Sequence, residues 1–263
     1  TPAAPDPIPA GESLTANPSS IVRLAPHTRI PYTAQFSFGV ERQLQKATAI
    51  TATYIGTRLI SAFRSRDVNA PLPPLFGGRP DPSIAVLRQI ESSGRLQSDA
   101  LEIALRGDVT RFFNGMVQYN YGRAYNNTGG INWFPANNWD LTGEWARADF
   151  DQRHRFSLLG TLRPRRFFNL GIGLSLNSGA PYSTTTGRDD NQDGQAADRP
   201  AGIPRNSLQG PGYASLDLRC SREFFLMPSK KDKGPAATVA LDAFNLLNRV
   251  NYAGFVGNLS SPF

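Results

Sequence analysis

Alternation of apolar and polar residues along eight segments constrains the fold of this chain more than any other feature. In one of them the apolar residues Phe168, Leu170, Ile172, Leu174 and Leu176 are separated by residues that are polar or small. Successive side chains of a β-strand point to opposite faces, so each such segment has one apolar and one polar face. The segments run to about 11–14 residues, whereas an ordinary strand has about 5–6. The pattern predicts an all-β fold of long, two-faced strands.

The lengths of the connections follow a second regular pattern. Short connections follow the first, third, fifth and seventh segments, and long ones follow the second, fourth and sixth. We expect strands at about 30–44, 47–58, 95–106, 112–124, 153–163, 167–178, 213–226 and 236–247. The long loops are then 59–94, 125–152 and 179–212, and the flanking stretches 1–29 and 248–263 also read as loops. The stretch 84–105 fits an amphipathic helix as well, so its conformation stays open.

This arrangement is typical of a transmembrane β-barrel, which has short periplasmic turns and long extracellular loops. A tilted strand needs about 9–11 residues to cross a bilayer, which these segments provide. Phenylalanine pairs stand beside the short turns, as an aromatic girdle at the membrane interface requires; they are Phe112–Phe113, Phe167–Phe168 and Phe224–Phe225. We therefore predict antiparallel β-barrel strands in the lipid of an outer membrane. A secreted, soluble β-sandwich that binds carbohydrate is the alternative from another class.

Composition excludes several other classes. The chain is 40% hydrophobic with a mean hydropathy of -0.35, and no run approaches the roughly 18 apolar residues of a membrane-spanning helix. The net charge is +7, but the basic residues are spread over turns and loops, so we expect no nucleic-acid partner. Cys220 is the only cysteine, so no internal disulfide is possible. The first residues from Thr1 contain neither the basic nor the apolar region of an export signal, so we expect no such signal within residues 1–263.

Several stretches resemble the C-terminal barrel of TonB-dependent outer-membrane receptors, in particular the Oar-like branch that carries a carboxypeptidase-regulatory-like domain. The matching pieces are IPYTAQFSFGVERQL (30–44), ATYIGTR (52–58), DFDQRHRFSLLGTLRP (149–164), GAPYSTTTGRDDNQDGQAADRPAGIPRN (179–206) and LDAFNLLNRVNY (241–252). They occur in the order of the family and cover most of residues 30–252.

The resemblance implies a barrel of about 22 strands, of which about eight are visible, so the chain is expected to form an arc of it. The plug domain, the TonB-contact segment and the closing strand are not visible in residues 1–263. By the same resemblance, the parent protein uses TonB and its plug to take up a scarce ligand, captured by the loops 1–29, 59–94, 125–152 and 179–212. The ligand could be a siderophore, a saccharide or a peptide. A non-transport structural or adhesion barrel is the other membrane hypothesis.

One loop motif suggests a metal. Asp189, Asn191, Asp193 and Gly194 spell D-x-N-x-D-G, which is how a calcium-binding EF-hand loop begins. The twelfth position holds Pro200 where an EF-hand has glutamate, so an EF-hand is excluded. The motif is either a loop site for Ca²⁺ or a solvated Asx-turn. No cofactor is required by any other motif.

The remaining candidates are aromatic and charged side chains. Trp133, Phe134, Trp139 and Trp145 share one loop, where they either form a ligand platform or pack the loop down. Six charged residues are expected on the lumen-facing side of the strands, where they line a substrate route or hydrate the interior: Glu102, Arg106, Arg153, Arg155, Asp217 and Arg219.

Enzymatic activity has little support in the sequence. Asp149, Asp151 and His154 lie close together at the start of a strand, but a general base needs an orienting partner and a positioned water or nucleophile. No nucleophile elbow, Cys/His zinc set or phosphate loop is present in the sequence. We therefore assign no catalytic residue and predict that the protein is not an enzyme.

Overall fold

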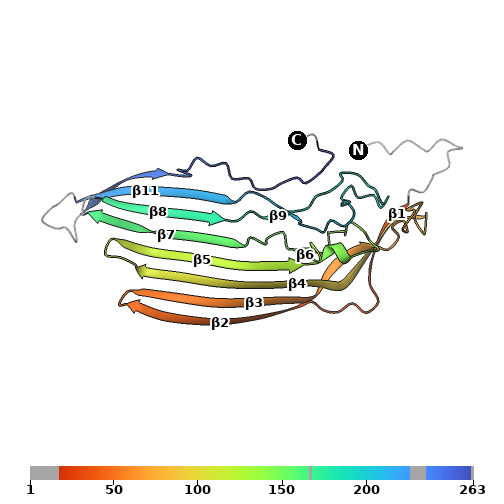
Figure 1. Cartoon of the computed structure of the whole chain (residues 1–263), viewed down its shortest axis with the longest axis horizontal. Helices are drawn as coiled ribbons and strands as arrows, with labels where there is room; N and C mark the ends of the chain where they lie inside the picture. The colour runs from red at the N-terminus through yellow and green to blue at the C-terminus, as the bar shows by residue number, and fades with distance from the viewer. Residues whose placement is uncertain (1–17, 166–167, 226–234, 262–263) are drawn as a thin grey trace, which may run out of the picture.

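Eight long strands lie side by side in one antiparallel layer (Figure 1). The computed structural model describes residues 18–165, 168–225 and 235–261. In the order of the sheet the strands are β12 (Ala236–Ala243), β11 (Tyr213–Phe225), β8 (Phe168–Asn177), β7 (His154–Arg165), β5 (Phe113–Asn126), β4 (Ile84–Asp108), β3 (Thr48–Asp67) and β2 (Tyr32–Gln45). The all-β, antiparallel architecture expected from the sequence is confirmed.

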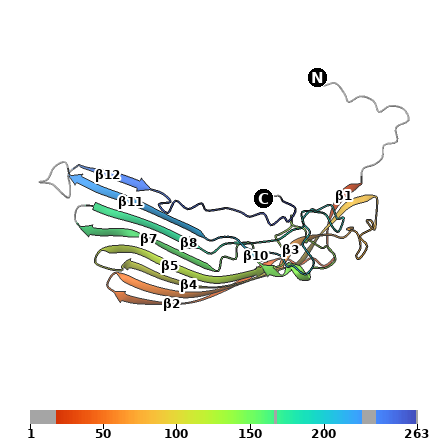
Figure 2. The same ribbon diagram turned by 45° about the horizontal axis from the view of Figure 1, so that its top comes forward.

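Short and long connections lie at opposite ends of the sheet (Figures 1 and 2). Two residues, 46–47, join β2 to β3, and 109–112 join β4 to β5, at what we call the inner end. The other end, called the outer end, carries the long loops. Phe167 and the basic turn expected near 230–233 lie outside the described residues. The alternation of connection lengths in the sequence therefore separates the short turns at the inner end from the long loops at the outer end.

Strand registers bring apolar residues into continuous rows across the sheet. One row joins residues that stand directly opposite one another on seven strands: Val40, Ala52, Ile103, Tyr119, Phe156, Leu176 and Ala214. The adjacent row on the other face is polar or small: Glu41, Thr51, Ala104, Gln118, Ser157, Ser175 and Ser215. We call the two sides the apolar face and the polar face. A slip of one residue in any strand would exchange its faces, so the pattern specifies the register.

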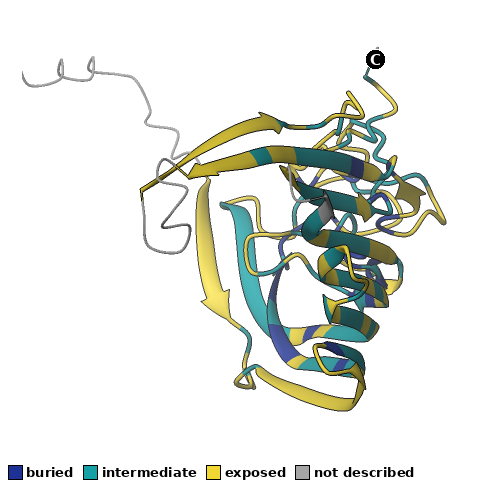
Figure 3. Cartoon of the chain, turned by 90° about the vertical axis from the view of Figure 1, so that its left-hand side faces the viewer, coloured by how far each residue is buried: buried dark blue, intermediate teal, exposed yellow. Residues whose placement is uncertain are grey.

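The interior of an ordinary soluble domain is missing from the described residues. Their buried hydrophobic side chains are six alanines, whereas Phe38 and Leu241 on the apolar face are 71% and 74% exposed. Figure 3 shows the same distribution, with exposed and half-buried residues along most of the sheet. Apart from the short pair of β9 (Pro181–Tyr182) and β10 (Leu208–Gln209), no second sheet occurs in the described part of the chain. The β-sandwich alternative is therefore wrong. No described helix is both long and apolar enough to span a membrane.

The loop expected at 59–94 is wrong in most of its length. β3 continues to Asp67 and β4 begins at Ile84, so only 68–83 connects them. The extensions pair with each other, and Arg64 and Arg66 both bind the carboxylate of Glu91. Polar residues on both faces removed the alternation that marks a strand in the sequence. The helical alternative for 84–105 is also wrong, because β4 covers the whole of this stretch.

A strand also occurs where the sequence suggested a loop at 1–29. β1 (Ser19–Leu24) runs parallel to the outer half of β4. It takes this position because β5 ends at Asn126, opposite Leu96, and beyond that point only β3 pairs with β4, so the other edge of β4 is open to β1. Residues 1–17 lie outside the described residues.

The last strand is shorter than the expected 236–247. β12 ends at Ala243, and the next backbone amides find partners elsewhere. Asn245 donates to the carboxylate of Asp217, and Leu246 donates to the carbonyl of Leu216.

Candidate functional site

The long loops gather at the outer end of the sheet (Figure 2). Buried polar groups bind them to one another. Besides 68–83, the long loops are 127–153, which contains the short 3-10 helix η1 (Thr142–Glu144) and β6 (Ala146–Arg147), and 178–212. Among the described residues, buried polar side chains outnumber buried hydrophobic ones, and most of them belong to these loops or to the strand ends beneath. Buried polar groups need partners, so the hydrogen bonds define how the loops fold.

Arg205 stands at the centre of one group of contacts. It is 2% exposed, and its Nη2 donates to the carbonyl of Asn126 at 3.0 Å and also to the Asn126 side chain. Nη1 lies 3.3 Å from Asp149, and Nε lies 3.8 Å from Glu144 Oε2. Burial lowers the pKa of the Arg205 guanidinium, and the charges of Asp149 and Glu144 oppose this effect. Because Asn126 belongs to the polar face of β5, Arg205 ties the loop 178–212 to that face.

Glu144 extends the same group. Its Oε1 lies 2.6 Å from Arg199 Nη2 and also accepts a hydrogen bond from the backbone amide of Ala136. Both Glu144 and Arg199 are shielded from solvent. We call Glu144, Asp149, Arg199 and Arg205 the Arg205 cluster. It joins η1 to Arg199 and Arg205 of the loop 178–212, more than fifty residues away in sequence.

A second group joins the end of β3 to the loops. Asp67 Oδ2 lies 2.6 Å from Arg79 Nη1, and the Asp67 amide donates to Asn138 Oδ1 at 2.7 Å. Asn138 in turn donates to the carboxylate of Asp193 at 2.7 Å. Arg79 also donates to the Asp193 carbonyl, so three separate loops share these contacts.

The candidate calcium motif is part of this second group. Backbone amides of Asp193 and Gly194 donate to the two carboxylate oxygens of Asp189, and the Asn191 side chain accepts a further bond from the Asp193 amide. Burial, and then the negative charges of Asp198 and Asp189, raise the pKa of Asp193 to about 6. No group of three or more His, Cys, Asp or Glu side chains in the described residues is arranged to hold a metal. Loop Ca²⁺ stays a prediction, which a change in melting temperature on adding chelator would support.

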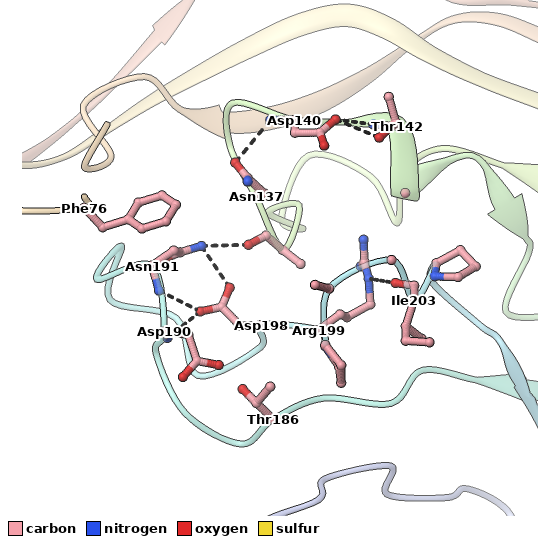
Figure 4. Close-up of a pocket in the computed structure, with 16 residues that line it drawn as sticks. Phe76, Asn137, Asp140, Thr142, Thr186, Asp190, Asn191, Asp198, Arg199 and Ile203 are labelled. Atoms are coloured by element: carbon pink, nitrogen blue, oxygen red, sulfur yellow. Dashed lines mark hydrogen bonds between the residues drawn. The ribbon is translucent and has the colours of Figure 1, made fainter. Parts of the chain in front are cut away.

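A cavity of about 780 Å³ lies between these loops (Figure 4). Asn137, Asp140 and Thr142 border it on one side, and Asp198 and Arg199 on the other. The Asp140 carboxylate accepts hydrogen bonds from the amide and hydroxyl of Thr142, which hold its pKa below the usual range. The cavity is open to solvent, and its lining also contains apolar residues such as Phe76 and Ile203. Arg199 and Asp198 are already bound to other protein groups, so the cavity combines apolar surface with the polar groups of Asn137, Asp140 and Thr142.

The four loop aromatics do not form a common platform. Trp139 donates from its ring nitrogen to the Pro71 carbonyl at 3.0 Å, and the Arg88 guanidinium lies over the ring of Phe134. Trp145 stacks on Tyr125. Trp133 is exposed, and its backbone amide donates to the Gly130 carbonyl in a turn. Among the described rings no two of the four are in contact. Their role in ligand binding stays a prediction.

Five of the six charged candidates lie on strand positions of the polar face. Glu102 and Arg155 border a shallow hollow of about 440 Å³ with Gln118 and Asn120. Arg106 lies 3.7 Å from Glu41, Arg219 lies 3.3 Å from Asp242, and Asp217 accepts from the Asn245 amide. That this face lines a lumen stays a prediction.

Arg153, the sixth candidate, and His154 both bind neighbouring protein side chains. Arg153 binds Asp151 at 3.1 Å and donates to the hydroxyl of Tyr125. The ring nitrogen Nδ1 of His154 lies 2.7 Å from the hydroxyl of Tyr119. The Asp151 carboxylate is occupied by Arg147, Arg153 and a backbone amide.

The sequence did not identify the Arg205 cluster. Arg199 and Arg205 flank a glycine- and proline-containing turn, as many solvated arginines do. Their carboxylate partners are far away along the chain, so no local spacing announces the pairs.

The model of the family described as "Outer membrane beta barrel domain" matches residues 1–204. The chain belongs to this family. As an outer-membrane barrel domain, it places its apolar face in lipid, which accounts for the exposure of Phe38 and Leu241. The localisation predicted from the sequence is confirmed.

A solved structure gives a similar fold. The outer membrane transporter YddB from Escherichia coli matches 89% of this chain with a TM-score of 0.57 and 11% identity. The match covers 31% of YddB, so the barrel domain described here spans under a third of that protein. The ferric-catecholate import receptor Fiu from E. coli matches with 13% identity over 83% of this chain and 24% of Fiu, with a TM-score of 0.49. None of the curated proteins matches the chain in sequence.

Proposed function

We propose that this barrel domain is part of an outer-membrane receptor that takes up a scarce extracellular ligand, with energy delivered by TonB through a plug domain. The observation that carries the proposal is an apolar pair on the polar face. Met116 and Leu159 stand directly opposite each other on β5 and β7, and they are 38% and 65% exposed.

These two side chains are out of place in a water-filled lumen. Their neighbours in the same row are Arg106 and Asp217, and Gly173 opposite Leu159 leaves the leucine side chain uncovered. Burying an exposed leucine contributes roughly 1.5–3 kcal/mol. A plug domain packed against the polar face would supply that burial, whereas an empty channel would not.

The loop cavity supports the capture step of the proposal. It lies at the end of the sheet that carries the long loops, which are extracellular in outer-membrane barrels, and its lining combines Asn137, Asp140 and Thr142 with apolar residues. The ligand class stays open among ferric siderophores, saccharides and peptides, since likeness of fold is a weak guide to substrate.

A non-transport structural or adhesion barrel is the second candidate. The observation that favours it is the set of buried ion pairs that ties the loops down. Loops held in this way could present a constant surface to a neighbouring cell or matrix.

Labelling of Leu159 separates the two candidates without knowledge of the ligand. We would introduce Leu159→Cys into the full-length protein in a Cys220→Ser background and treat whole membranes with a water-soluble maleimide. Transport predicts slow labelling that becomes fast when the plug is deleted. A matched variant, Ile203→Cys in an exposed loop, should react quickly in both proteins. Fast labelling of Leu159→Cys in the intact protein would contradict the plug contact and favour the structural barrel.

A further inference from the structure

The apolar face changes character toward the outer end. Along β4, the residues on this face are Leu105, Ile103 and Leu101, followed by Asp99, Gln97 and Arg95. The register places Tyr54 and Tyr121 on either side of Leu101. Tyrosines at this level are typical of the membrane interface. Residues beyond them on the same face therefore meet lipid headgroups rather than hydrocarbon.

Arginines collect on the apolar face just beyond the tyrosines. Arg58 and Arg123 flank Asp99, at 2.8 and 3.9 Å. Arg29 and Arg95 lie farther out and border a hollow of about 480 Å³. We call Arg29, Arg58, Arg95 and Arg123 the arginine patch. These contacts bring one acid, Asp99, among the four arginines. The patch therefore carries an excess of positive charge.

Two of these arginines have no partner for their charge. Both Arg29 and Arg95 are exposed, and within the described part of the chain no acid or acceptor binds either guanidinium. Elsewhere at the outer end, Arg64 of β3 and Arg79 and Arg205 of the loops each have a carboxylate partner. A cation turned toward the lipid without a partner suits an anionic headgroup.

The other residues of the hollow suit a sugar. The Ser92 hydroxyl accepts a hydrogen bond from the Arg29 amide and can still donate one, and the Ser93 hydroxyl donates to Glu91 and can still accept one. The ring of Trp145 forms part of the wall. Aromatic faces bind the apolar side of sugar rings, and the guanidinium matches phosphate oxygens. We propose that the arginine patch binds the phosphorylated saccharide headgroup of the outer-leaflet glycolipid, lipopolysaccharide.

Binding of lipopolysaccharide to the full-length protein in neutral detergent tests the proposal. Each arginine beside an anionic surface contributes about a fivefold change in affinity, so Arg29→Gln with Arg95→Gln should weaken binding by about 25-fold. Arg95→Gln alone should weaken it about fivefold. Arg42→Gln is the matched control, because Arg42 is an exposed arginine of the same face at the inner end. It should leave the affinity unchanged.

Variants and probes together decide the outcome. Within the described residues neither guanidinium has a partner to lose, and the substitutions keep the backbone hydrogen bonds of both residues. The lipid-free melting temperature should therefore stay constant. Dephosphorylated lipopolysaccharide should bind about as weakly as native lipopolysaccharide binds the double variant. Equal affinity of the double variant and the wild type would overturn the proposal. So would equally tight binding of phosphatidylglycerol or of inorganic phosphate, since charge alone would then explain the interaction.

Discussion

Replacing Arg205 by methionine should open the outer loops. The substitution keeps most of the apolar stem of the side chain but removes its hydrogen bonds to Asn126 and its charge beside Glu144. Arg205 is 2% exposed, so water cannot replace these contacts without rearrangement of the loop. The contacts join the loop 178–212 to β5, and their loss should appear as local opening rather than unfolding of the barrel.

The magnitude follows from the burial of each partner. Breaking a buried ion pair by removing one member costs about 3–5 kcal/mol. The contact with Asp149 adds little, because that carboxylate is largely solvent-exposed. Glu144 keeps Arg199 at 2.6 Å, so its charge is not left alone. We therefore expect the lower end, about 3 kcal/mol, which corresponds to about a 150-fold increase in the open population.

Proteolysis of the loops in outer-membrane vesicles measures this population. When opening and closing are fast relative to cleavage, the rate of cleavage follows the equilibrium fraction of open loop. A broad-specificity protease is required, because trypsin would lose a site at Arg205. The control is Arg219→Met, since Arg219 is 59% exposed and its bond to Asp242 is 3.3 Å long. An exposed pair contributes about 0–1 kcal/mol, so cleavage should rise less than about fivefold. If Arg205→Met changes cleavage no more than this control, the Arg205 cluster does not hold the loops.

Two further predictions concern pH and the membrane. The pKa of Asp193 is raised from 3.8 to about 6, so the folded loop holds this proton more tightly than the unfolded loop, and loop stability is lost as pH rises through that interval. Asp193→Asn should flatten the dependence of the loop proteolysis rate on pH in the same interval. An unaltered slope would contradict the raised pKa. For the membrane, spin labels at Leu174 and Ser175 in a Cys220→Ser background should be quenched by oxygen at Leu174 and by an aqueous nickel complex at Ser175. Equal quenching of both labels would contradict the assignment of the two faces.

Alternation along the sequence predicted the rows of the sheet because hydrocarbon contacts a single layer directly. Leu174 lies opposite both Leu158 and Leu216, and Ser175 lies opposite both Ser157 and Ser215. The parity of each strand was therefore readable from its own residues. Outside the membrane this signal ends. In the extensions of β3 and β4, both faces meet water or loops, and 59–94 accordingly read as irregular.

The sequence separation between contacting residues decides which parts of the candidate site could be predicted from the sequence. The hydrogen bonds of Asp189 reach amides four and five residues away, and the sequence predicted an Asx-turn or a calcium loop there. Arg205 binds Asn126, 79 residues away, and only the folded sheet brings the two together. Composition does show that the loops contain arginines. It does not show which of them find carboxylates.

That difference between arginines also locates the hydrocarbon boundary. From Asp99 to Asp108, β4 advances nine residues, which at about 3.4 Å per residue and a tilt of about 40° spans about 23 Å across the membrane. Outer-membrane barrels have an apolar band of about 25 Å, so the two aspartates lie near its limits. Arg95 is four residues farther out, or about 10 Å by the same geometry. An unpaired guanidinium cannot lie in hydrocarbon at low cost, but at this height it meets headgroups. The buried arginines of the loop 178–212 take carboxylate partners from the protein, whereas Arg95 can take its counter-charge from the lipid.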